Sequence, residues 1–425
     1  MSKTKNRAVL FLQGPLSMLY KHIGNQLKSE GVRVHRINLS LGDWLHWHGP
    51  ESISYRRSRE EWPGFIADYM KQHDITDLVL HGDSRWYHKH AITEARQLNI
   101  QVIVTELGLI RPGWLSLEKD GLGLNSHFPD DPEQILKTAS QLPEIENPEP
   151  FRHPFWIKAL FDASYNLINC IFWFTYPHFI RHTPHFPLLE YPRWIPRLLN
   201  EKKRNKYATS CINELINNNE RFVVFPLQLS GDFQIRAHSP FPSMREAIEL
   251  VLNNFAKSAP EGMKLLIKQH PSDNGLDKLK QHTLAKASKL GIYDRIIYID
   301  GGSLDLATAA SQGMVTVNST AGIEALQHYI PVKTLAPALY SMPKLTHQGD
   351  LSSFWHSPEQ PQHRYVDALI KLLLNATQVK GALYGDSAIE HGSRNICLRI
   401  VENRVSQPGA YLDHAPRLKK ADWKN

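Results

Sequence analysis

Polar side chains that can act on a phosphate or a sugar follow the apolar runs in the second half of this sequence. Lys268-Gln269-His270-Pro271 comes directly after the apolar run Lys264–Ile267. Proline holds the preceding residue in an extended conformation, so we expect His270 at the carboxyl end of a strand, with Lys268 beside it. An imidazole there can donate to a phosphate or protonate a leaving group. The simpler alternative is a strand-end histidine bonded to a neighbouring carbonyl.

Two further segments place small polar residues at similar positions. Asn318-Ser319-Thr320 runs from an apolar strand into a helix predicted to begin near Ser319. Free N–H groups at a helix start suit a single phosphate, although capping by Ser319 explains the same residues. Gln228 and Asp232 follow the first apolar run of this half. Asp232 is a candidate nucleophile or base, and the alternative is a turn aspartate bonded to its own backbone.

The first half of the chain carries a second set of polar strand ends, which comprises Gln13, Asp83, Arg85, Glu106 and Arg111. Glu106 is a further candidate acid or base, and Arg111 can pair with it or with an anionic substrate. The segment around Asp83 and Arg85 fits a salt-bridged loop as well as a binding site. Ligands of open α/β sheets bind beyond the carboxyl ends of the strands, so these clusters predict a binding site.

Short apolar runs that alternate with helical patterns must position these residues. The predicted strands are Ala8–Gln13, Val32–Leu39, Asp77–Gly82, Gln101–Glu106, Phe222–Leu229, Lys264–His270, Ile296–Asp300, Met314–Asn318 and Val332–Leu335. Helices are predicted over Met18–Ser29 and Trp62–Gln72, and another begins at the capping box Ser243-Met244-Arg245-Glu246. The alternation predicts an α/β protein of two doubly wound, Rossmann-like domains that face a central cleft.

Composition marks the boundaries between these parts. Residues 1–150 form a first predicted Rossmann-like domain, 151–206 an aromatic and basic connector, 207–380 a second Rossmann-like domain and 381–425 a helix with a basic tail. We expect the aromatic residues of the connector, such as Trp156, Trp173 and Phe174, in core or interfacial packing. The connector is also a candidate for membrane contact because of its charge.

Charge and composition exclude several classes of protein. The chain has 425 residues, a hydrophobic fraction of 42% and a formal net charge of +7, which is ordinary for a globular protein. Three scattered cysteines offer no disulfide framework or zinc spacing, and no signal peptide or membrane-spanning segment is expected. The nucleotide-binding motifs G-x-G-x-x-G and G-x-x-x-x-G-K-[ST] are absent, and so is the Asp-x-Asp pair that binds a divalent metal. We therefore expect no metal and no cofactor.

The positive charge is concentrated in two segments. Tyr191–Lys206 contains six Lys or Arg residues and one Glu, and Tyr411–Asn425 contains four and two acidic residues. This distribution favours an anionic membrane surface over nucleic acid as a partner. Neutralising Lys202, Lys203 and Arg204 is expected to weaken binding to anionic vesicles.

A series of short motifs resembles bacterial capsule polysaccharide biosynthesis proteins of the KpsS/LipB type, which are β-Kdo transferases. The motifs occur in one order over residues 7 to 360 and are Phe11-Leu12-Gln13-Gly14-Pro15, Arg36-Ile37-Asn38, Gly42-Asp43, His81-Gly82-Asp83-Ser84-Arg85, Glu106, Arg111-Pro112, Gln228, Asp232, His270-Pro271, Asn318-Ser319-Thr320 and Leu345-Thr346-His347-Gln348.

The resemblance implies a GT-B glycosyltransferase that moves Kdo from CMP-Kdo, in β linkage and without a metal, onto a phosphatidylglycerol-type lipid. It implies a peripheral location on the cytoplasmic face of the inner membrane and contact with other capsule assembly and export proteins. By the resemblance, Asp232 is the nucleophile, Glu106 the acceptor-side carboxylate, and His270 with Asn318, Ser319 and Thr320 holds the CMP phosphate. Gln228 and Lys268 are expected on the donor side, and Gln13, Asp83, Arg85 and Arg111 on the acceptor side.

Three alternatives remain open at the level of the sequence. One is a different GT-B activity, either a transferase with another nucleotide sugar or an epimerase. Another is a non-catalytic capsule assembly or export protein. The third, a nucleic-acid-binding protein, has only the net charge in its favour.

Overall fold

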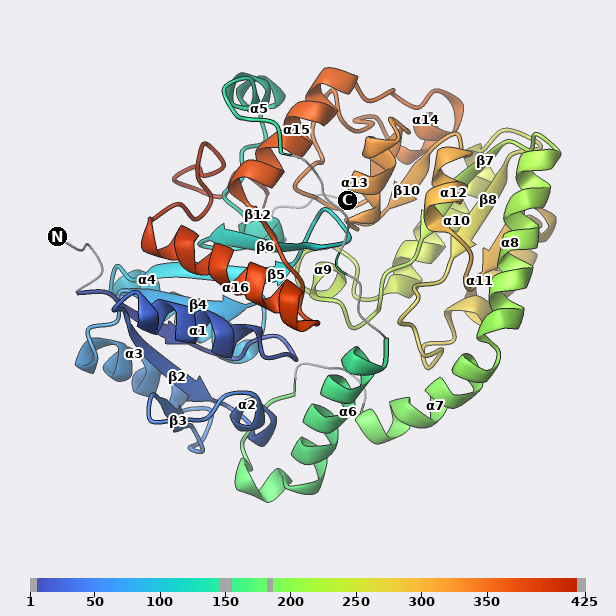
Figure 1. The fold of residues 1–425 in the computed structure, drawn as a ribbon. Coiled ribbons are helices and arrows are strands. Elements are labelled where there is room, and N and C mark those ends of the chain that lie inside the picture. Colours follow the sequence, from blue (N-terminus) through green and yellow to red (C-terminus); the bar gives the residue numbers. More distant parts are fainter. Residues whose placement is uncertain (1–5, 146–150, 152–154, 182–185, 419–425) are drawn as a thin grey trace. The chain divides into compact units, whose positions relative to one another are not determined.

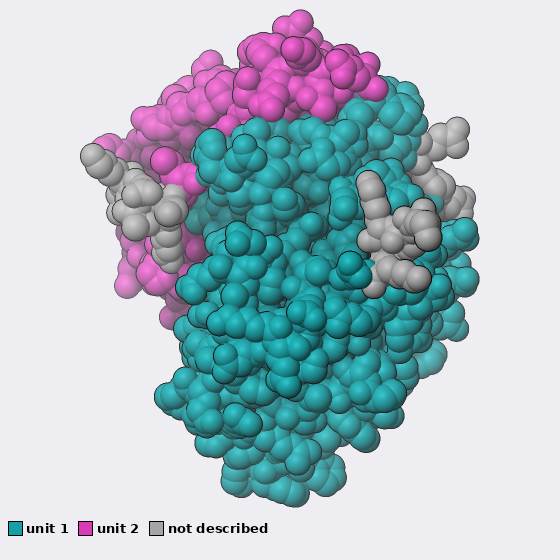
Figure 2. Space-filling view, turned by 90° about the vertical axis from the view of Figure 1, so that its left-hand side faces the viewer, with its two compact units in different colours: residues 1–129, 142–182, 371–416 teal, residues 130–141, 183–370, 417–425 magenta. Residues whose placement is uncertain are grey.

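The computed structural model describes residues 6–145, 151, 155–181 and 186–418 (Figure 1). The chain divides into two compact units, shown in different colours in Figure 2. Unit 1 comprises Met1–Pro129, Leu142–His182 and Lys371–Pro416, and unit 2 comprises Asp130–Gln141, Thr183–Ile370 and Arg417–Asn425. Each unit contains a wholly or mainly parallel sheet with helices on both faces, which confirms the predicted α/β class.

Unit 1 is built on a seven-stranded sheet in the order β12-β6-β5-β4-β1-β2-β3. Its strands are β1 (Ala8–Phe11), β2 (Arg33–Asn38), β3 (Ser52–Ser54), β4 (Asp77–His81), β5 (Gln101–Leu107), β6 (Trp114–Lys119) and β12 (Gln378–Lys380). Its helices are α1 (Leu19–Ser29), α2 (Leu41–His46), α3 (Trp62–Gln72), α4 (Trp86–Gln97), η1 (Gly123–Asn125), α6 (Phe155–Ile171), η2 (Trp173–Thr175) and α16 (Asp386–Val401). Strands β1 to β5 are parallel, whereas β6 and β12 are antiparallel to their neighbours.

The apolar residues of each central strand alternate between the two faces of this sheet. Leu10 of β1 packs with α3 and α4 on one face, and Val9 and Phe11 pack with α1 and α16 on the other. A strand buried on both faces reads as a continuous apolar run, which is why β1 and β4 were recognisable in the sequence.

Unit 2 contains a five-stranded, fully parallel sheet in the order β11-β10-β7-β8-β9. The strands are β7 (Phe222–Pro226), β8 (Lys264–Lys268), β9 (Ile296–Ile299), β10 (Met314–Thr316) and β11 (Val332–Thr334). The helices are α5 (Pro132–Ala139), α7 (Pro187–Leu199), α8 (Glu201–Asn217), α9 (Phe233–Arg236), α10 (Met244–Ser258), α11 (Leu279–Lys289), η3 (Tyr293–Arg295), α12 (Leu304–Ala309), α13 (Ala321–Gln327) and α14 (Leu351–His356). The division between the units falls within α15 (His363–Ala376).

Each strand predicted from an apolar run is present, but most end one to three residues earlier than expected. The excess residues, such as Gln13 and His270, belong to the loops that leave the sheet. Helix α10 begins at Met244, with the hydroxyl of Ser243 accepting a hydrogen bond from the Arg245 amide at 3.2 Å. The predicted capping residue is therefore confirmed.

The division of the chain differs from the predicted boundaries in two places, and the first is Asp130–Gln141, which was expected in the first domain and lies in unit 2. Residues 371–380, expected in the second domain, lie in unit 1, where β12 pairs with β6 through Val379 and Leu115. Helix α16 follows and covers unit 1 together with α1. A three-residue edge strand gives almost no periodic signal, so this return was not predictable from local sequence.

The aromatic connector does not form a separate body. Its first part, α6 and η2, belongs to unit 1, and α7 and α8 belong to unit 2. Of its aromatic residues, Tyr165 and Tyr176 are buried, whereas Trp156, Trp173 and Phe174 are each more than 60% exposed. The expectation that these three pack in a core or an interface was wrong for the described structure.

Candidate functional site

The switch point of unit 2 lies between β7 and β10, where the order of strands reverses and where ligands of open α/β sheets bind. Gln228 follows β7 and Asn318 follows β10. The Gln228 side-chain amide donates to Asn318 Oδ1 at 3.1 Å, and the Asn318 backbone N–H donates to Gln228 Oε1 at 3.3 Å. The structure thus brings together two residues that are 90 positions apart and that the sequence assigned to the same site.

The side chain of Asn318 connects three segments. Its Nδ2 group donates to the carbonyls of Gln234 and His238 at 3.0 and 3.2 Å, and its oxygen accepts from Gln228. The residue is 7% exposed. Asn318 therefore positions the loop that carries Asp232, and the predicted contact of its side chain with a phosphate stays a prediction.

Asp232 precedes the short helix α9 and caps it. Its Oδ1 accepts the backbone N–H of Gln234 at 2.9 Å, and its own backbone N–H donates to Leu229. The alternative of a turn aspartate bonded to its own backbone is thus correct for this oxygen. The carboxylate is half-buried and held in place by the cap, an arrangement that is compatible with a nucleophile.

Lys268 and His270 lie at the carboxyl end of β8. The Nδ1 atom of His270 accepts the backbone N–H of Ser272 at 3.0 Å. The neutral imidazole that accepts at Nδ1 carries its proton on Nε2, which is therefore a donor. Lys268 is buried, and burial lowers the pKa of its amine, while the carboxylate of Asp300 raises it.

Ser319 and Thr320 precede α13. The hydroxyl of Ser319 accepts the backbone N–H of Ala321 at 3.2 Å, and its carbonyl accepts from the hydroxyl of Tyr340 at 2.5 Å. The N-cap residue of α13 is Thr320, whose side chain makes no capping bond, so the bond from the Ala321 N–H to Ser319 belongs to the turn before the helix and is not the expected N-cap. Both side chains are half-buried, and phosphate binding by them stays a prediction.

In unit 1 the predicted residue Gln13 belongs to a buried network. Its side-chain amide donates to the Tyr165 hydroxyl at 2.6 Å and lies 3.4 Å from Asp43 Oδ1. Asp43 also accepts from the Leu39 backbone N–H at 3.1 Å and from the Tyr165 hydroxyl at 3.2 Å. Arg36 lies 3.8 Å from the same carboxylate. The network joins the ends of β1 and β2 to α6.

Helix α6 supplies two members of this site that the sequence reasoning missed. Tyr165 contacts Gln13 and Ser40, and Asn169 accepts the backbone N–H of Gly42 at 2.9 Å. A side chain at Gly42 would overlap Tyr165 and Asn169, so only glycine permits this approach. The two residues are four positions apart and share a helix face, which was the available signal.

Glu106 is the penultimate residue of β5 and lies beside His81. Its Oε1 lies 3.5 Å from His81 Nε2 and accepts the backbone N–H of Leu107 at 3.1 Å. The side chain is 41% exposed, yet protein atoms crowd it enough that desolvation raises its pKa, against lowering effects of Leu107, Arg85 and Arg111. A carboxylate with a raised pKa suits acid or base chemistry.

The remaining acceptor-side residues have structural partners. Asp83 accepts from the Leu122 backbone N–H and the Asn125 amide, both at 3.0 Å, and thus holds the loop at η1. Arg111 donates to the Gly108 carbonyl at 3.0 Å, and Arg85 lies 3.4 Å from the Gly14 carbonyl. A direct contact of Asp83 with an acceptor stays a prediction, and its bonds point to a supporting role.

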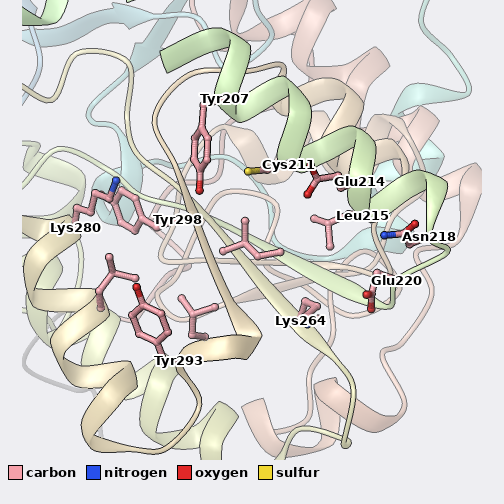
Figure 3. Close-up of a pocket in the computed structure, with 13 residues that line it drawn as sticks. Tyr207, Cys211, Glu214, Leu215, Asn218, Glu220, Lys264, Lys280, Tyr293 and Tyr298 are labelled. Carbon is pink, nitrogen blue, oxygen red and sulfur yellow. The ribbon is translucent and has the colours of Figure 1, made fainter. Parts of the chain in front are cut away.

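A pocket of about 460 Å³ opens beside the edge strand β9 (Figure 3). In the figure Tyr207, Cys211 and Glu214 come from α8, and Tyr293 faces them from η3. None of the residues predicted from the sequence lines it. It lies toward the amino ends of β8 and β9, beside Lys264 and Ile296, whereas the predicted residues lie at the carboxyl ends.

Two features are absent from the described residues. No group of three or more His, Cys, Asp or Glu side chains there is arranged to hold a metal ion. In the same part of the chain, no helix has both the length and the apolar character needed to cross a membrane.

Two α/β units with polar side chains at the carboxyl ends of their parallel strands define a doubly wound fold, a class whose ligands bind beyond those strand ends. Within that fold class, the comparison with known sequences identifies one family. The chain belongs to the family of capsule polysaccharide biosynthesis proteins, whose model matches residues 76–384.

Individual relatives cover most of the chain. The capsule polysaccharide export protein KpsS of Escherichia coli is 29% identical over 88% of this chain and 96% of its own length. The capsule polysaccharide modification protein LipB of Neisseria meningitidis serogroup A is 30% identical over 88% and 91%. Among solved structures, the β-Kdo 2,7 transferase of Thermosulfurimonas dismutans KpsC is 13% identical, with a TM-score of 0.44 over 93% of this chain and 99% of that one. The resemblance inferred from the motifs is thus confirmed at the level of the family.

Proposed function

We propose that this protein is a retaining GT-B-like glycosyltransferase that moves Kdo from CMP-Kdo in β linkage onto a phosphatidylglycerol-type lipid, as part of the linker of a capsule. Membership of the capsule biosynthesis family supports the pathway. The observation that carries the proposal is the joining of Gln228 to Asn318 at the switch point of unit 2, which positions the loop of Asp232. We further propose that the enzyme acts on the cytoplasmic face of the inner membrane, beside other capsule assembly and export proteins.

Retention of configuration requires two displacements. In the first, the Asp232 carboxylate bonds to C2 of Kdo while the bond from C2 to the phosphate oxygen breaks and CMP leaves with the electron pair. The Nε2–H group of His270 stabilises the charge that develops on the phosphate. In the second, the lipid hydroxyl attacks C2, Asp232 is released, and Glu106 takes the hydroxyl proton. Lys268, Ser319 and Thr320 add positive or hydrogen-bonding groups on the donor side.

The capping role of Asp232 makes a sharp test possible. Asparagine caps a helix as well as aspartate but is no nucleophile, so Asp232→Asn should keep the cap and the stability and lose transfer. Asp232→Ala should lose transfer and also about 1 kcal/mol of stability. The assay follows CMP release and the mass of the lipid product, with CMP-Kdo and a short-chain phosphatidylglycerol.

Two controls decide the outcome. UDP-sugars in place of CMP-Kdo test for another transferase or an epimerase, and thermal unfolding reports the fold of each variant. Near-wild-type turnover by Asp232→Asn would remove Asp232 from the mechanism. CMP release with no lipid product would support CMP-Kdo as the donor and would refute the phosphatidylglycerol-type lipid as the acceptor.

A further inference from the structure

Helix α7 carries its apolar side chains on the outside. Ile195, Leu198 and Leu199 have the spacing of one helix face, and they are 61%, 51% and 81% exposed. Leu189 on the preceding turns is also exposed. Scattered exposed leucines are ordinary in soluble proteins, but a contiguous apolar face of this kind marks an interaction surface.

The opposite side of α7 is attached to unit 2 by charge. Arg197 makes a bidentate ion pair with Asp300, with N···O distances of 2.8 and 2.9 Å. Arg204 of α8 contacts the same carboxylate at 2.7 Å. The Arg204 guanidinium also donates to the carbonyl of Arg197 at 2.8 Å. The helix therefore turns Arg197 toward the protein and Leu198 and Leu199 away from it, the reverse of a helix that packs on a core.

Three lysines supply exposed positive charge next to this face, in addition to the exposed Arg193 of α7. Lys202, Lys203 and Lys206 at the start of α8 are all exposed, with Glu201 as the acidic residue among them. Arg204, which the sequence grouped with these lysines, is engaged by Asp300. The lysines attract anionic lipid headgroups, and the neighbouring apolar face suits the acyl boundary beneath them.

We propose that the exposed face of α7 and the lysines of α8, here called the α7 surface, bind an anionic lipid bilayer. Helix α7 would lie in the interfacial region of that bilayer. A bilayer is favoured over a protein partner because aliphatic residues and lysines adjoin along one short segment, and lysine is depleted in protein interfaces. The proposal rests on the proposed function for the membrane location, which it assigns to a surface of unit 2, and it makes no use of the sugar donor or of the catalytic residues.

The test is a flotation assay with the full-length protein and vesicles of phosphatidylcholine, either alone or with about 30 mol% phosphatidylglycerol, which makes the surface strongly negative. The variants are Lys202→Gln/Lys203→Gln/Lys206→Gln and Leu198→Ser/Leu199→Ser. The matched control is Lys257→Gln/Lys280→Gln/Lys289→Gln, which removes equal charge from exposed positions on α10 and α11. Leu250→Ser, an exposed leucine on α10, is the apolar control.

The wild-type protein should bind vesicles that contain phosphatidylglycerol, and the lysine variant should bind them at least about tenfold more weakly. The leucine variant should lose the binding that remains at high salt, because that part is apolar. Both controls should bind as the wild type does, and CMP release without lipid should be unchanged in every variant. Equal loss in the two lysine variants, or wild-type binding by the leucine variant, would overturn the proposal.

A second copy of the chain is the competing occupant of this face. Analytical ultracentrifugation without lipid measures it directly. A dimer that dissociates in Leu198→Ser/Leu199→Ser would overturn the bilayer proposal, and a mass that is the same in wild type and variant supports it. Failure of these tests leaves the proposed reaction untouched, since Asp232→Asn tests that separately.

Discussion

His46 is a buried base in unit 1. It is 8% exposed and stacks on Tyr165, with the ring centroids 5.6 Å apart, and within the described part of the chain its Nε2 atom has no hydrogen-bond partner. Burial lowers its pKa to about 4; the charge of Asp43 opposes this shift, and that of Arg36 adds to it. The imidazole is therefore neutral at pH 7, and the folded state resists its protonation.

Because the pKa of His46 is lowered in the folded protein, we expect the stability to depend on pH. The pKa of His46 is about 4 in the folded protein and about 6.5 unfolded, so the unfolded state takes up the proton first as the pH falls. Stability due to this group is lost between about pH 6.5 and pH 4, to a total of about 3 kcal/mol. His46→Phe should keep the aromatic packing and lessen this loss, as measured by urea unfolding at pH 7 and pH 5.

The control for this prediction is a histidine two residues away. His48 is exposed and stacks on Trp44, so His48→Phe should leave the pH dependence as it is in the wild type. If His46→Phe loses as much stability between pH 7 and pH 5 as the wild type does, the assignment of the effect to His46 is wrong.

At the scale of elements, the candidate site of unit 2 depends on one amide that joins two strand ends. The Asn318 side chain accepts from Gln228 after β7 and donates to the carbonyls of Gln234 and His238 around α9. An amide is required, because it both accepts and donates at this buried position.

Asn318→Asp should remove the hydrogen bonds that the Asn318 amide donates to the segment around α9. The carboxylate has no donor for the carbonyls of Gln234 and His238, and an unsatisfied buried group costs about 1–3 kcal/mol. We expect that loss of stability in urea unfolding, together with a raised KM for the sugar donor as the Asp232 loop loosens. Asn375→Asp is the matched control, since that amide donates to the carbonyls of Lys371 and Pro143 in unit 1. An unchanged KM in Asn318→Asp would contradict the positioning role.

At the scale of the molecule, the last part of the chain completes the first unit. Strand β12 extends the sheet beside β6, and Ile389, Ile396 and Ile400 of α16 cover the face that α1 also covers. Arg399 donates to the carbonyls of Asn375, Ala376 and Gln378, and so ties α16 to the end of α15. The stability of unit 1 therefore depends on Lys371–Pro416, which follows the longest segment of unit 2 in the sequence.

A substitution at Gly381 tests the packing of α16 against the segment that follows β12. A Cβ atom at this position would overlap the backbone of Gly392 in α16, so Gly381→Ala should displace the helix and cost about 1–3 kcal/mol. Hydrogen exchange should show the loss in α16 and α1. Gly64→Ala in α3 is the control, because a Cβ there meets nothing and alanine favours a helix by up to about 1 kcal/mol. Wild-type protection of α16 in Gly381→Ala would refute the close approach.

The sequence by itself determined the α/β class, the buried strands and the family. Strands buried on both faces are continuous apolar runs, and their polar ends are local, so Gln228, Asp232, His270 and Glu106 were visible without a structure. Only the tertiary structure decided the strand order, the return of β12 and α16 to unit 1, and the partners of each polar residue. In the folded protein Gln228 bonds to Asn318, and Tyr165 of α6 bonds to Gln13. Asp83 accepts a hydrogen bond from the loop at Leu122, and Arg204 pairs with Asp300. These contacts link residues 39 to 152 positions apart, and no local pattern encodes which distant partner satisfies a buried hydrogen-bonding group.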